Sequence, residues 1–124
     1  MDGRDIEVLY ATEKAKVAES LVADRENWAV ETVRAVETVK ERHSPTEFDC
    51  FVTEYDLPGG NGLDLLEWVR GADPDLPVIL HARAGSEAVA SEAISAGVTD
   101  YLREDDEERL RLVLQRRVEN AGKP

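Results

Sequence analysis

The fold is decided by one stretch of sequence, Asp49-Cys50-Phe51-Val52-Thr53-Glu54-Tyr55-Asp56-Leu57-Pro58-Gly59-Gly60-Asn61-Gly62. Its first part, residues 50–53, is apolar or β-branched, too short for a helix and bounded by loop residues. This pattern is typical of a strand buried on both faces of a parallel sheet. Glu54 is therefore expected at the carboxyl end of that strand, the edge where ligands and reactive side chains gather in open α/β sheets.

The residues after Glu54 predict a loop and then a helix. Asp56 opens the loop, Pro58 fixes its backbone, and Asn61 can cap the helix that follows. Glycines free the backbone for a sharp turn, and apolar residues then recur at helical spacing: Gly59, Gly60 and Gly62, followed by Leu63, Leu65, Leu66 and Val69. A carboxylate at a strand tip beside a turn also occurs in purely structural loops, so this segment alone does not decide the function.

Length and composition predict one domain. The 124 residues, 42% of them hydrophobic, suffice for one domain with a single core, expected to span residues 1–124. That this chain is part of a longer protein is left open. No run approaches the roughly 18 apolar residues of a membrane span, and the first residues do not resemble a signal peptide. The lone Cys50 falls in the buried strand, which favours a core position over a reactive thiol. We therefore expect a cytoplasmic protein with no membrane partner.

The charge is strongly negative. The 27 acidic and 15 basic residues give a formal net charge of −12, which disfavours nucleic-acid binding. The basic residues are mostly arginine, and the lysines are few: Lys14, Lys16, Lys40 and Lys123. Such a surface is typical of proteins adapted to high internal salt, as in halophilic archaea, where counterions screen the repulsion. An ordinary acidic domain is the alternative.

Hydrophobic periodicity predicts five strands alternating with five helices. The strands are expected at residues 6–11, 28–33, 50–53, 78–81 and 98–102, and apolar stripes at helical spacing lie between and after them. Ser86 is expected to cap the fourth helix and Gly97 to end it. This order implies a parallel sheet covered on both faces through right-handed crossovers. His81 is interpreted as a packed or hydrogen-bonded histidine rather than an acid-base group, and Trp28 and Trp68 are interpreted as packing residues.

Two motifs resemble the response-regulator receiver (CheY-like) family over essentially the full chain. They are the loop at residues 56–62 and the run Ala-Ile-Ser-Ala-Gly-Val-Thr-Asp-Tyr-Leu at residues 93–102. The resemblance implies a flavodoxin-like doubly wound sheet of order 2-1-3-4-5 with five flanking helices. It also implies a place in a two-component phosphorelay.

The family's phosphoryl chemistry requires residues that this chain replaces. The family uses an acidic pair after strand one to hold Mg²⁺, an Asp on strand three, a hydroxyl ending strand four and a Lys ending strand five. By position these fall here on Thr12 and Glu13, Glu54, Ala82 and Glu104. The switch aromatic is retained as Tyr101. The chain is therefore interpreted as a degenerate receiver, a pseudo-receiver.

The replacements predict that phosphoryl transfer is lost. Glu54 displaces the nucleophile by a methylene, Glu104 puts an anion where the family has a cation, and Ala82 donates no hydrogen bond. We expect a phosphorylation-independent protein-interaction module with no enzymatic activity and no catalytic residue. The open alternative is an active receiver that uses Glu54 or another carboxylate. A flavodoxin-like ligand-binding domain is a third possibility, without a phosphate loop to support it.

The resemblance also locates a pocket and an interaction face. Glu13 and Glu54 are weak candidates for Mg²⁺, so no cofactor is expected. Arg83 is hypothesised to pair with one of these carboxylates, whereas Arg103 should leave the pocket. The family's face of helix four, strand five and helix five would contact a histidine kinase, an output domain or a second copy, and would here include Val89, Ala93, Tyr101 and Arg111.

Overall fold

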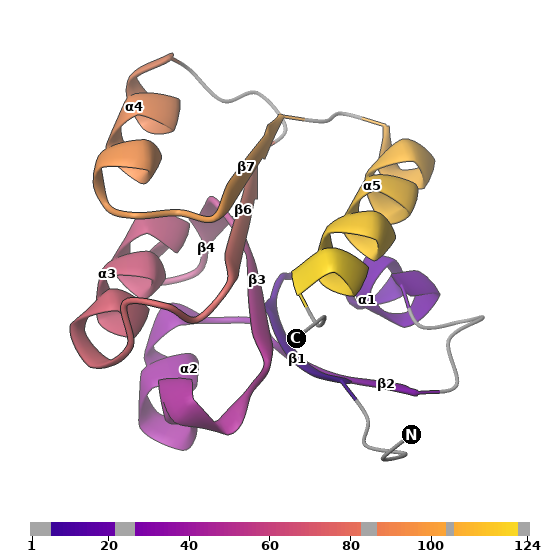
Figure 1. Cartoon of the computed structure of the whole chain (residues 1–124), viewed down its shortest axis with the longest axis horizontal. Helices are drawn as coiled ribbons and strands as arrows, with labels where there is room; N and C mark the ends of the chain where they lie inside the picture. The colour runs from indigo at the N-terminus through magenta and orange to yellow at the C-terminus, as the bar shows by residue number, and fades with distance from the viewer. Residues whose placement is uncertain (1–5, 22–26, 83–86, 104–105, 122–124) are drawn as a thin grey trace.

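A central parallel sheet organises the molecule. The computed structural model describes residues 6–21, 27–82, 87–103 and 106–121. Its five main strands lie in the order β2-β1-β3-β6-β7 (Figure 1), and their bounds are β2 (Trp28–Val33), β1 (Ile6–Ala11), β3 (Cys50–Glu54), β6 (Val78–Ala82) and β7 (Asp100–Arg103). Two short strands, β4 (Asp56–Leu57) and β5 (Gly60–Asn61), form a separate antiparallel pair. The predicted order 2-1-3-4-5 is therefore confirmed for the main sheet.

Helices cover both faces of the sheet. On one face lie α1 (Ala15–Leu21) and α5 (Glu107–Ala121), which contact each other. The other face carries α2 (Val36–Arg42), α3 (Gly62–Ala72) and α4 (Glu87–Ser95), as Figure 1 shows. A short 3₁₀ turn, η1 (Pro45–Glu47), precedes β3. The predicted flavodoxin-like fold with five flanking helices is confirmed.

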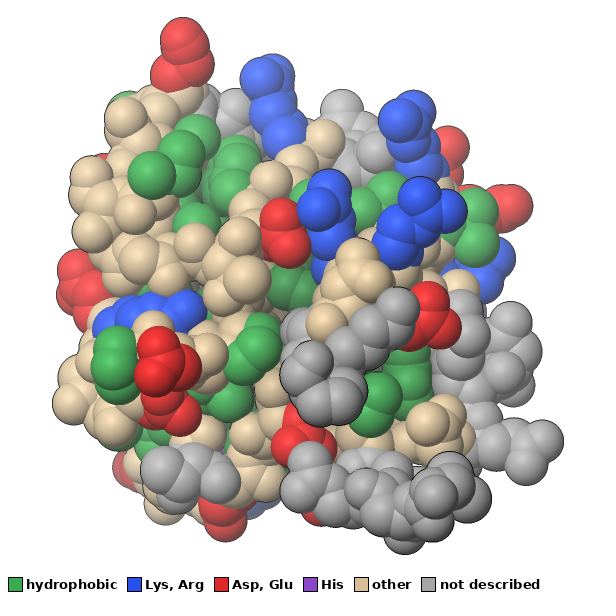
Figure 2. Space-filling view, in the orientation of Figure 1, with side chains coloured by type: hydrophobic (Ala, Val, Ile, Leu, Met, Phe, Trp, Pro, Cys, Tyr) green, Lys and Arg blue, Asp and Glu red, His purple; other side chains and the backbone are tan. Residues whose placement is uncertain are grey.

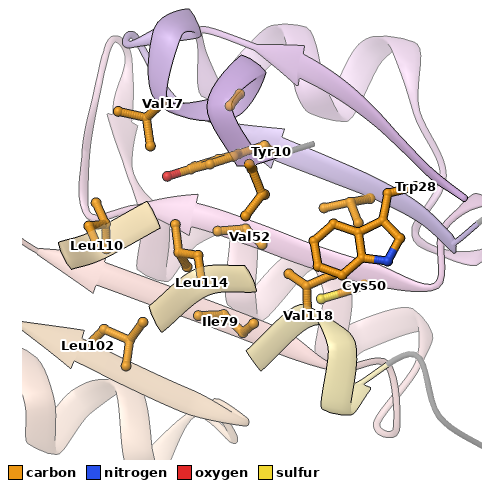
Figure 3. Close-up of a cluster of buried hydrophobic side chains, with 13 residues drawn as sticks. Tyr10, Val17, Trp28, Cys50, Val52, Ile79, Leu102, Leu110, Leu114 and Val118 are labelled. Atoms are coloured by element: carbon orange, nitrogen blue, oxygen red, sulfur yellow. The ribbon is translucent and has the colours of Figure 1, made fainter. Parts of the chain in front are cut away.

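Alternating side chains divide the core into two layers. Along β1, Val8 and Tyr10 join the cluster beneath α1 and α5, whereas Leu9 joins the cluster beneath α2 and α3. Strand β3 alternates in the same way, with Val52 in the first cluster and Phe51 in the second. Figure 3 shows the first cluster, in which side chains of α5 lie over those of the strands. Burial on both faces explains the continuous apolar runs of these strands.

The start of α3 is fixed by a capping box. The Asn61 side-chain oxygen accepts hydrogen bonds from the backbone N–H groups of Leu63 (2.9 Å) and Asp64 (3.1 Å), and the Asp64 carboxylate accepts one from the Asn61 N–H (3.2 Å). The predicted Asn61 cap is confirmed. Gly62 is needed for close approach, since a Cβ there would lie 2.5 Å from the backbone oxygen of Glu54. The turn therefore fixes where the end of β3 lies.

The last strand differs from its prediction at both ends. It begins at Asp100 rather than at residue 98, because the Val98 N–H still bonds to the Ala93 carbonyl of α4 at 3.0 Å. The Thr99 N–H bonds to the Val78 carbonyl of β6 at 2.9 Å, directly before the strand. Gly97 lies in the turn after α4 with a φ of +92°, as the prediction of a helix-ending glycine requires. The expected cap at residue 86 lies outside the described residues.

Two further expectations concern burial and membranes. Cys50 is a free cysteine with no exposed surface, and burial raises the pKa of its thiol to about 12, so the core interpretation is confirmed. Trp28 is buried and Trp68 is half-buried, and both pack against core clusters. Across the described residues, no helix is both long and apolar enough to cross a membrane.

Candidate functional site

The candidate site is a small polar hollow where the carboxyl ends of β1, β3 and β6 meet. Its volume is about 120 Å³, and its lining consists of Glu13, Glu54, Tyr55, Asp56, His81 and Ala82. In the sheet register Glu54 lies opposite His81, and Ala82 lies opposite Arg103. The fold therefore brings together the predicted pocket residues of the first, third and fourth main strands.

Thr12 donates a hydrogen bond to the carboxylate instead of supplying a second acid. Its side chain is 1% exposed, and its hydroxyl donates to Oε2 of Glu54. The Thr12 Oγ1 in turn accepts a hydrogen bond from the Lys14 backbone N–H at 2.9 Å. The Glu13 backbone N–H also donates to the Glu54 carboxylate. The turn after β1 thus holds Glu54 from two directions.

The charges around Glu54 act in opposite directions. Burial is the largest influence and raises the pKa of this half-buried carboxyl, because it penalises the charged form. The positive charge of Lys14 and the Glu13 backbone hydrogen bond lower the pKa, whereas the negative charges of Glu13 and Asp56 raise it. The net effect is a raised pKa, so the ionised form depends on the donors and the cation that surround it.

Lys14 is a pocket cation that the sequence interpretation missed. Its charge acts on Glu54 and also on His81, which places it beside the hollow. Two signals pointed to it: Lys14 directly follows Thr12 and Glu13 in the loop, and it is one of the few lysines in a chain rich in arginine. Arg83 lies outside the described residues, so its proposed pairing stays a prediction. Arg103 is exposed, as strand alternation predicted.

His81 forms the floor of the hollow and is engaged with Tyr10. Its Nε2 lies 2.7 Å from the Tyr10 hydroxyl, and the two rings meet edge-on with centroids 5.7 Å apart. Burial and then the nearby charge of Lys14 lower the pKa of His81 to about 4. The imidazole is therefore neutral at neutral pH, and the interpretation of His81 as a packed, hydrogen-bonded histidine is confirmed.

Ala82 and Tyr101 are the residues predicted to be switch equivalents. Ala82 is buried at the end of β6 and brings no polar side-chain group to the hollow. Tyr101 is half-buried, and within the described part of the chain its buried hydroxyl has no hydrogen-bond partner. Burial raises the pKa of Tyr101, with opposing influences from Arg103 and Tyr55. Glu104, the predicted lysine equivalent, lies outside the described residues.

The residues fit a divalent cation poorly. Among the described residues, no group of three or more His, Cys, Asp or Glu side chains could hold a metal ion. Thr12 directs its hydroxyl hydrogen at Glu54, and the charge of Lys14 already acts on the same carboxylate. A Mg²⁺ ion would have to displace these partners while gaining few oxygen ligands. Weak metal affinity remains a prediction, with Glu13 and Glu54 as the candidate ligands.

The predicted interaction face needs two corrections. Ala93 has no exposed surface, because it lies on the packed side of α4, so its assignment to the face was wrong. Arg111 lies one turn before Gln115, whose side chain donates to the Leu21 carbonyl of α1 at 3.0 Å, so Arg111 lies on the α1 side of α5. The sequence gives the spacing of residues along α4 and α5, but it does not give the rotation of each helix about its own axis relative to the sheet. It therefore could not decide which residues of these helices lie on the face.

Other residues form the face instead. Arg117 bonds through Nη1 to the Asp100 carboxylate of β7 at 3.1 Å, so it marks the β7 side of α5. Val89 and Tyr101 are both half-buried, consistent with their predicted places on α4 and β7. The α4–β7–α5 face therefore includes Val89, Tyr101 and Arg117 rather than Ala93 and Arg111.

The fold and the hollow together define a class of protein. A doubly wound parallel sheet with carboxylates at the ends of its first and third strands is the architecture of a receiver-like α/β domain. The family model described as "Response regulator receiver domain" matches residues 12–115. The chain therefore belongs to the response regulator receiver domain family.

Curated relatives share part of this domain. The chain is 35% identical over 71 residues to the response regulator protein PilR of Pseudomonas aeruginosa, an alignment that covers 57% of this chain and 16% of PilR. It is 31% identical over 90 residues to the regulatory protein LuxO of Vibrio vulnificus, covering 72% of this chain and 19% of LuxO. The chain thus spans less than a fifth of the length of these two relatives.

Solved structures show the same fold. The non-phosphorylated HemR receiver domain of Leptospira biflexa superposes with a TM-score of 0.81 at 20% identity, covering 97% of this chain and 96% of that one. The beryllofluoride-activated NtrC4 receiver domain dimer gives a TM-score of 0.74 at 23% identity, covering 93% and 98% of the two chains. At these identities the likeness concerns the fold.

Proposed function

We propose that this receiver domain acts in two-component signalling as a protein-interaction module that does not depend on phosphorylation. The observation that carries the proposal is the engagement of Glu54 by the turn after β1, where the Thr12 hydroxyl and the Glu13 N–H donate to its carboxylate and the charge of Lys14 acts on it. In-line attack on a phosphodonor requires a free, aligned carboxylate oxygen. In the proposed state, the Glu54 carboxylate is therefore already bound by donors of the domain itself and is not free to attack a phosphodonor.

The surroundings of Glu54 offer little to an attached phosphoryl group. Ala82 supplies no hydroxyl donor, and the lysine position of the family holds Glu104. Phosphoryl transfer is promoted by cations and donors placed around the developing charge. Lys14 is a cation beside the pocket, and its positive charge already acts on the Glu54 carboxylate. These features support a domain whose surface, rather than its chemistry, carries the signal.

Intact mass spectrometry after incubation with a small-molecule phosphodonor and Mg²⁺ tests the proposal. We expect no stable adduct of one phosphoryl group on the wild-type chain. The rival function is an active receiver that uses a non-standard carboxylate. An adduct that is lost in Glu54→Gln but retained in Glu67→Gln, an exposed control on α3, would establish that rival.

Metal binding gives a separate test. We expect a Mg²⁺ titration to show no saturable site below about millimolar concentrations, the weak end for oxygen-ligand sites. The reason is that Thr12 replaces one carboxylate and donates its hydroxyl to Glu54. A tight site that disappears in Glu13→Ala and survives in Glu37→Ala, an exposed control on α2, would contradict this expectation.

The partners and the setting are part of the proposal. A histidine kinase or an output domain is the proposed partner. A second copy that contacts the α4–β7–α5 face is the other proposed partner; the NtrC4 receiver domain, which shares the fold, is described as a dimer. A cytoplasmic location remains a prediction, supported by the buried free thiol of Cys50. A high-salt source also remains a prediction, and a stability that rises steeply between low and molar KCl would support it.

A further inference from the structure

The outward side of α5 carries apolar side chains between arginines. Arg109, Leu112, Val113 and Arg116 follow the i, i+3, i+4, i+7 spacing that places side chains on one stripe of a helix. Leu112 is 54% exposed, and it and Ile94 are the large hydrophobic side chains that the described part of the chain exposes. Val113 packs partly against the core, so it links the stripe to the body of the domain. The stripe therefore places an exposed leucine between two arginines.

The stripe borders a shallow hollow. This hollow has a volume of about 270 Å³ and is lined by Leu112, Val113, Arg116 and Arg117. The ion pair of Arg117 with Asp100 holds one wall against β7. Arg116, which belongs to the stripe and also lines the hollow, is exposed. The hollow thus combines an apolar floor with guanidinium groups at its rim, and Arg117 connects it to the α4–β7–α5 face.

The charge of this surface is opposite to that of the whole chain. Four of the chain's 15 basic residues, Arg109, Arg111, Arg116 and Arg117, lie on α5 with three glutamates, so this helix has a formal charge of +1 in a chain of net charge −12. Figure 2 shows Lys and Arg side chains gathered over the region that α5 occupies in Figure 1, with hydrophobic side chains between them. Arginine is favoured at interfaces because it pairs with carboxylates in a forked geometry and packs through its apolar stem.

We propose that the outward stripe of α5 is the docking surface for an acidic amphipathic helix of a partner protein. The inference rests on the proposed function, because it names the chemistry of the partner that the interaction module recognises. Leucine or phenylalanine side chains of such a helix would cover Leu112 and Val113, and its glutamates or aspartates would pair with Arg116. The acidic remainder of the domain then repels wrongly placed acidic segments and guides the helix to α5.

Other occupants fit the surface less well. Nucleic acid would be repelled by a body of net charge −12 and would leave Leu112 without an apolar partner. A second copy carries the same excess of negative charge, so association of two copies opposes their overall repulsion. A partner helix needs only a local negative charge and an apolar edge, which is what the stripe complements.

The probe is a synthetic amphipathic peptide of glutamate and leucine, with the leucines spaced three and four residues apart. Titration into isotopically labelled protein should shift the amide resonances of α5 and the end of β7, with little change at α2. A peptide in which lysine replaces glutamate should not bind. Raising the KCl concentration should weaken the binding of the acidic peptide, because the arginines are at the surface.

Two variants separate the charged and the apolar contributions. Arg116→Glu and Leu112→Ser should each lower the affinity for the acidic peptide by about tenfold, equivalent to about 1.4 kcal/mol. Arg42→Glu is the matched control, because it makes the same charge change at an exposed position on α2. It should leave the affinity within about twofold. Thermal unfolding of all three variants checks that each is folded.

Several results would overturn the inference. The inference fails if the peptide produces no shifts on α5, if Arg42→Glu weakens binding as much as Arg116→Glu, or if a DNA duplex binds the stripe more tightly than the peptide. It also fails if sedimentation shows that the stripe is covered by a second copy. The titration is run with and without phosphodonor and Mg²⁺. Binding that appears only with them refutes phosphorylation independence but keeps the surface, whereas no binding in either condition refutes the surface alone.

Discussion

The hollow at the strand ends and the outward stripe of α5 differ in whether their polar side chains are bonded within the domain or exposed to solvent. In the hollow, Glu54 is held by Thr12, and His81 is hydrogen-bonded to Tyr10 beneath it. On α5, Arg116 is exposed and Leu112 has more than half of its surface in solvent. The first region satisfies its polar groups within the domain, and the second presents its groups to the outside. The difference favours recognition through the surface of α5 over chemistry in the hollow.

The largest expected contrast lies within α5 itself. Leu114 has no exposed surface and belongs to the core cluster, whereas Leu112, two residues earlier, is exposed. Leu114→Ala should lower the free energy of unfolding by about 2–5 kcal/mol, because it leaves a cavity. Leu112→Ala should change it by no more than about 0.5 kcal/mol. Urea unfolding measures both, and a large loss in Leu112→Ala would show that this residue serves the fold rather than a partner.

His81 should make the domain sensitive to acid. Its folded pKa of about 4 lies below the ordinary value of 6.5, so between these values the unfolded chain binds a proton that the folded chain does not. Stability is therefore lost as the pH falls from 6.5 towards 4, by roughly 3 kcal/mol over the full window. His81→Gln, which keeps an acceptor for Tyr10, should flatten this part of the stability profile. An unchanged slope would mean that His81 is not the group responsible.

The glycine beneath Glu54 should be far less tolerant than a glycine elsewhere on α3. A Cβ at Gly62 would lie 2.5 Å from the Glu54 carbonyl oxygen, whereas one at Gly71 would meet nothing within 4 Å. Gly62→Ala should cost about 1–3 kcal/mol through displaced backbone. Gly71→Ala should gain about 0.5–1 kcal/mol, because alanine loses less entropy in a helix. Equal effects in denaturant unfolding would contradict the close packing of α3 on the end of β3.

Glu54 should give the smallest effect, opposite in sign to that of His81. Its folded pKa is raised above the ordinary 4.5, so the folded state holds the proton more tightly than the unfolded chain. Its contribution to stability is present below pH 4.5 and is lost as the pH rises through the folded pKa. Glu54→Gln removes the titrating group and with it the loss of stability at neutral pH. The amide oxygen of the glutamine can still accept the hydrogen bond from Thr12. The melting temperature at neutral pH should therefore rise slightly. Glu67→Gln provides an exposed control on α3, and a lower melting temperature in Glu54→Gln alone would indicate that the ionised carboxylate stabilises the fold.

The sequence predicted the fold well because its signals were local. Short apolar runs identified the strands. Asn61 marked the start of one helix and Gly97 the end of another. The candidate site was predicted in composition but not in its contacts. The position of Glu54 follows from strand order, yet the role of Lys14 depends on how the loop after β1 folds back toward β3, which no periodicity encodes. The assignments of Ala93 and Arg111 failed because helical phase relative to the sheet is set by tertiary packing.

The central claim is that donors within the domain already bind the Glu54 carboxylate, so the pocket does not respond to a phosphoryl group. Its most direct test is to record amide NMR spectra of the labelled domain before and after adding Mg²⁺ with beryllofluoride, which mimics a phosphoryl group. We predict unchanged resonances for Glu54, Ala82 and Tyr101, because Thr12 and Lys14 already engage the carboxylate. Saturable shifts at these three residues, absent in Glu54→Gln, would contradict the account.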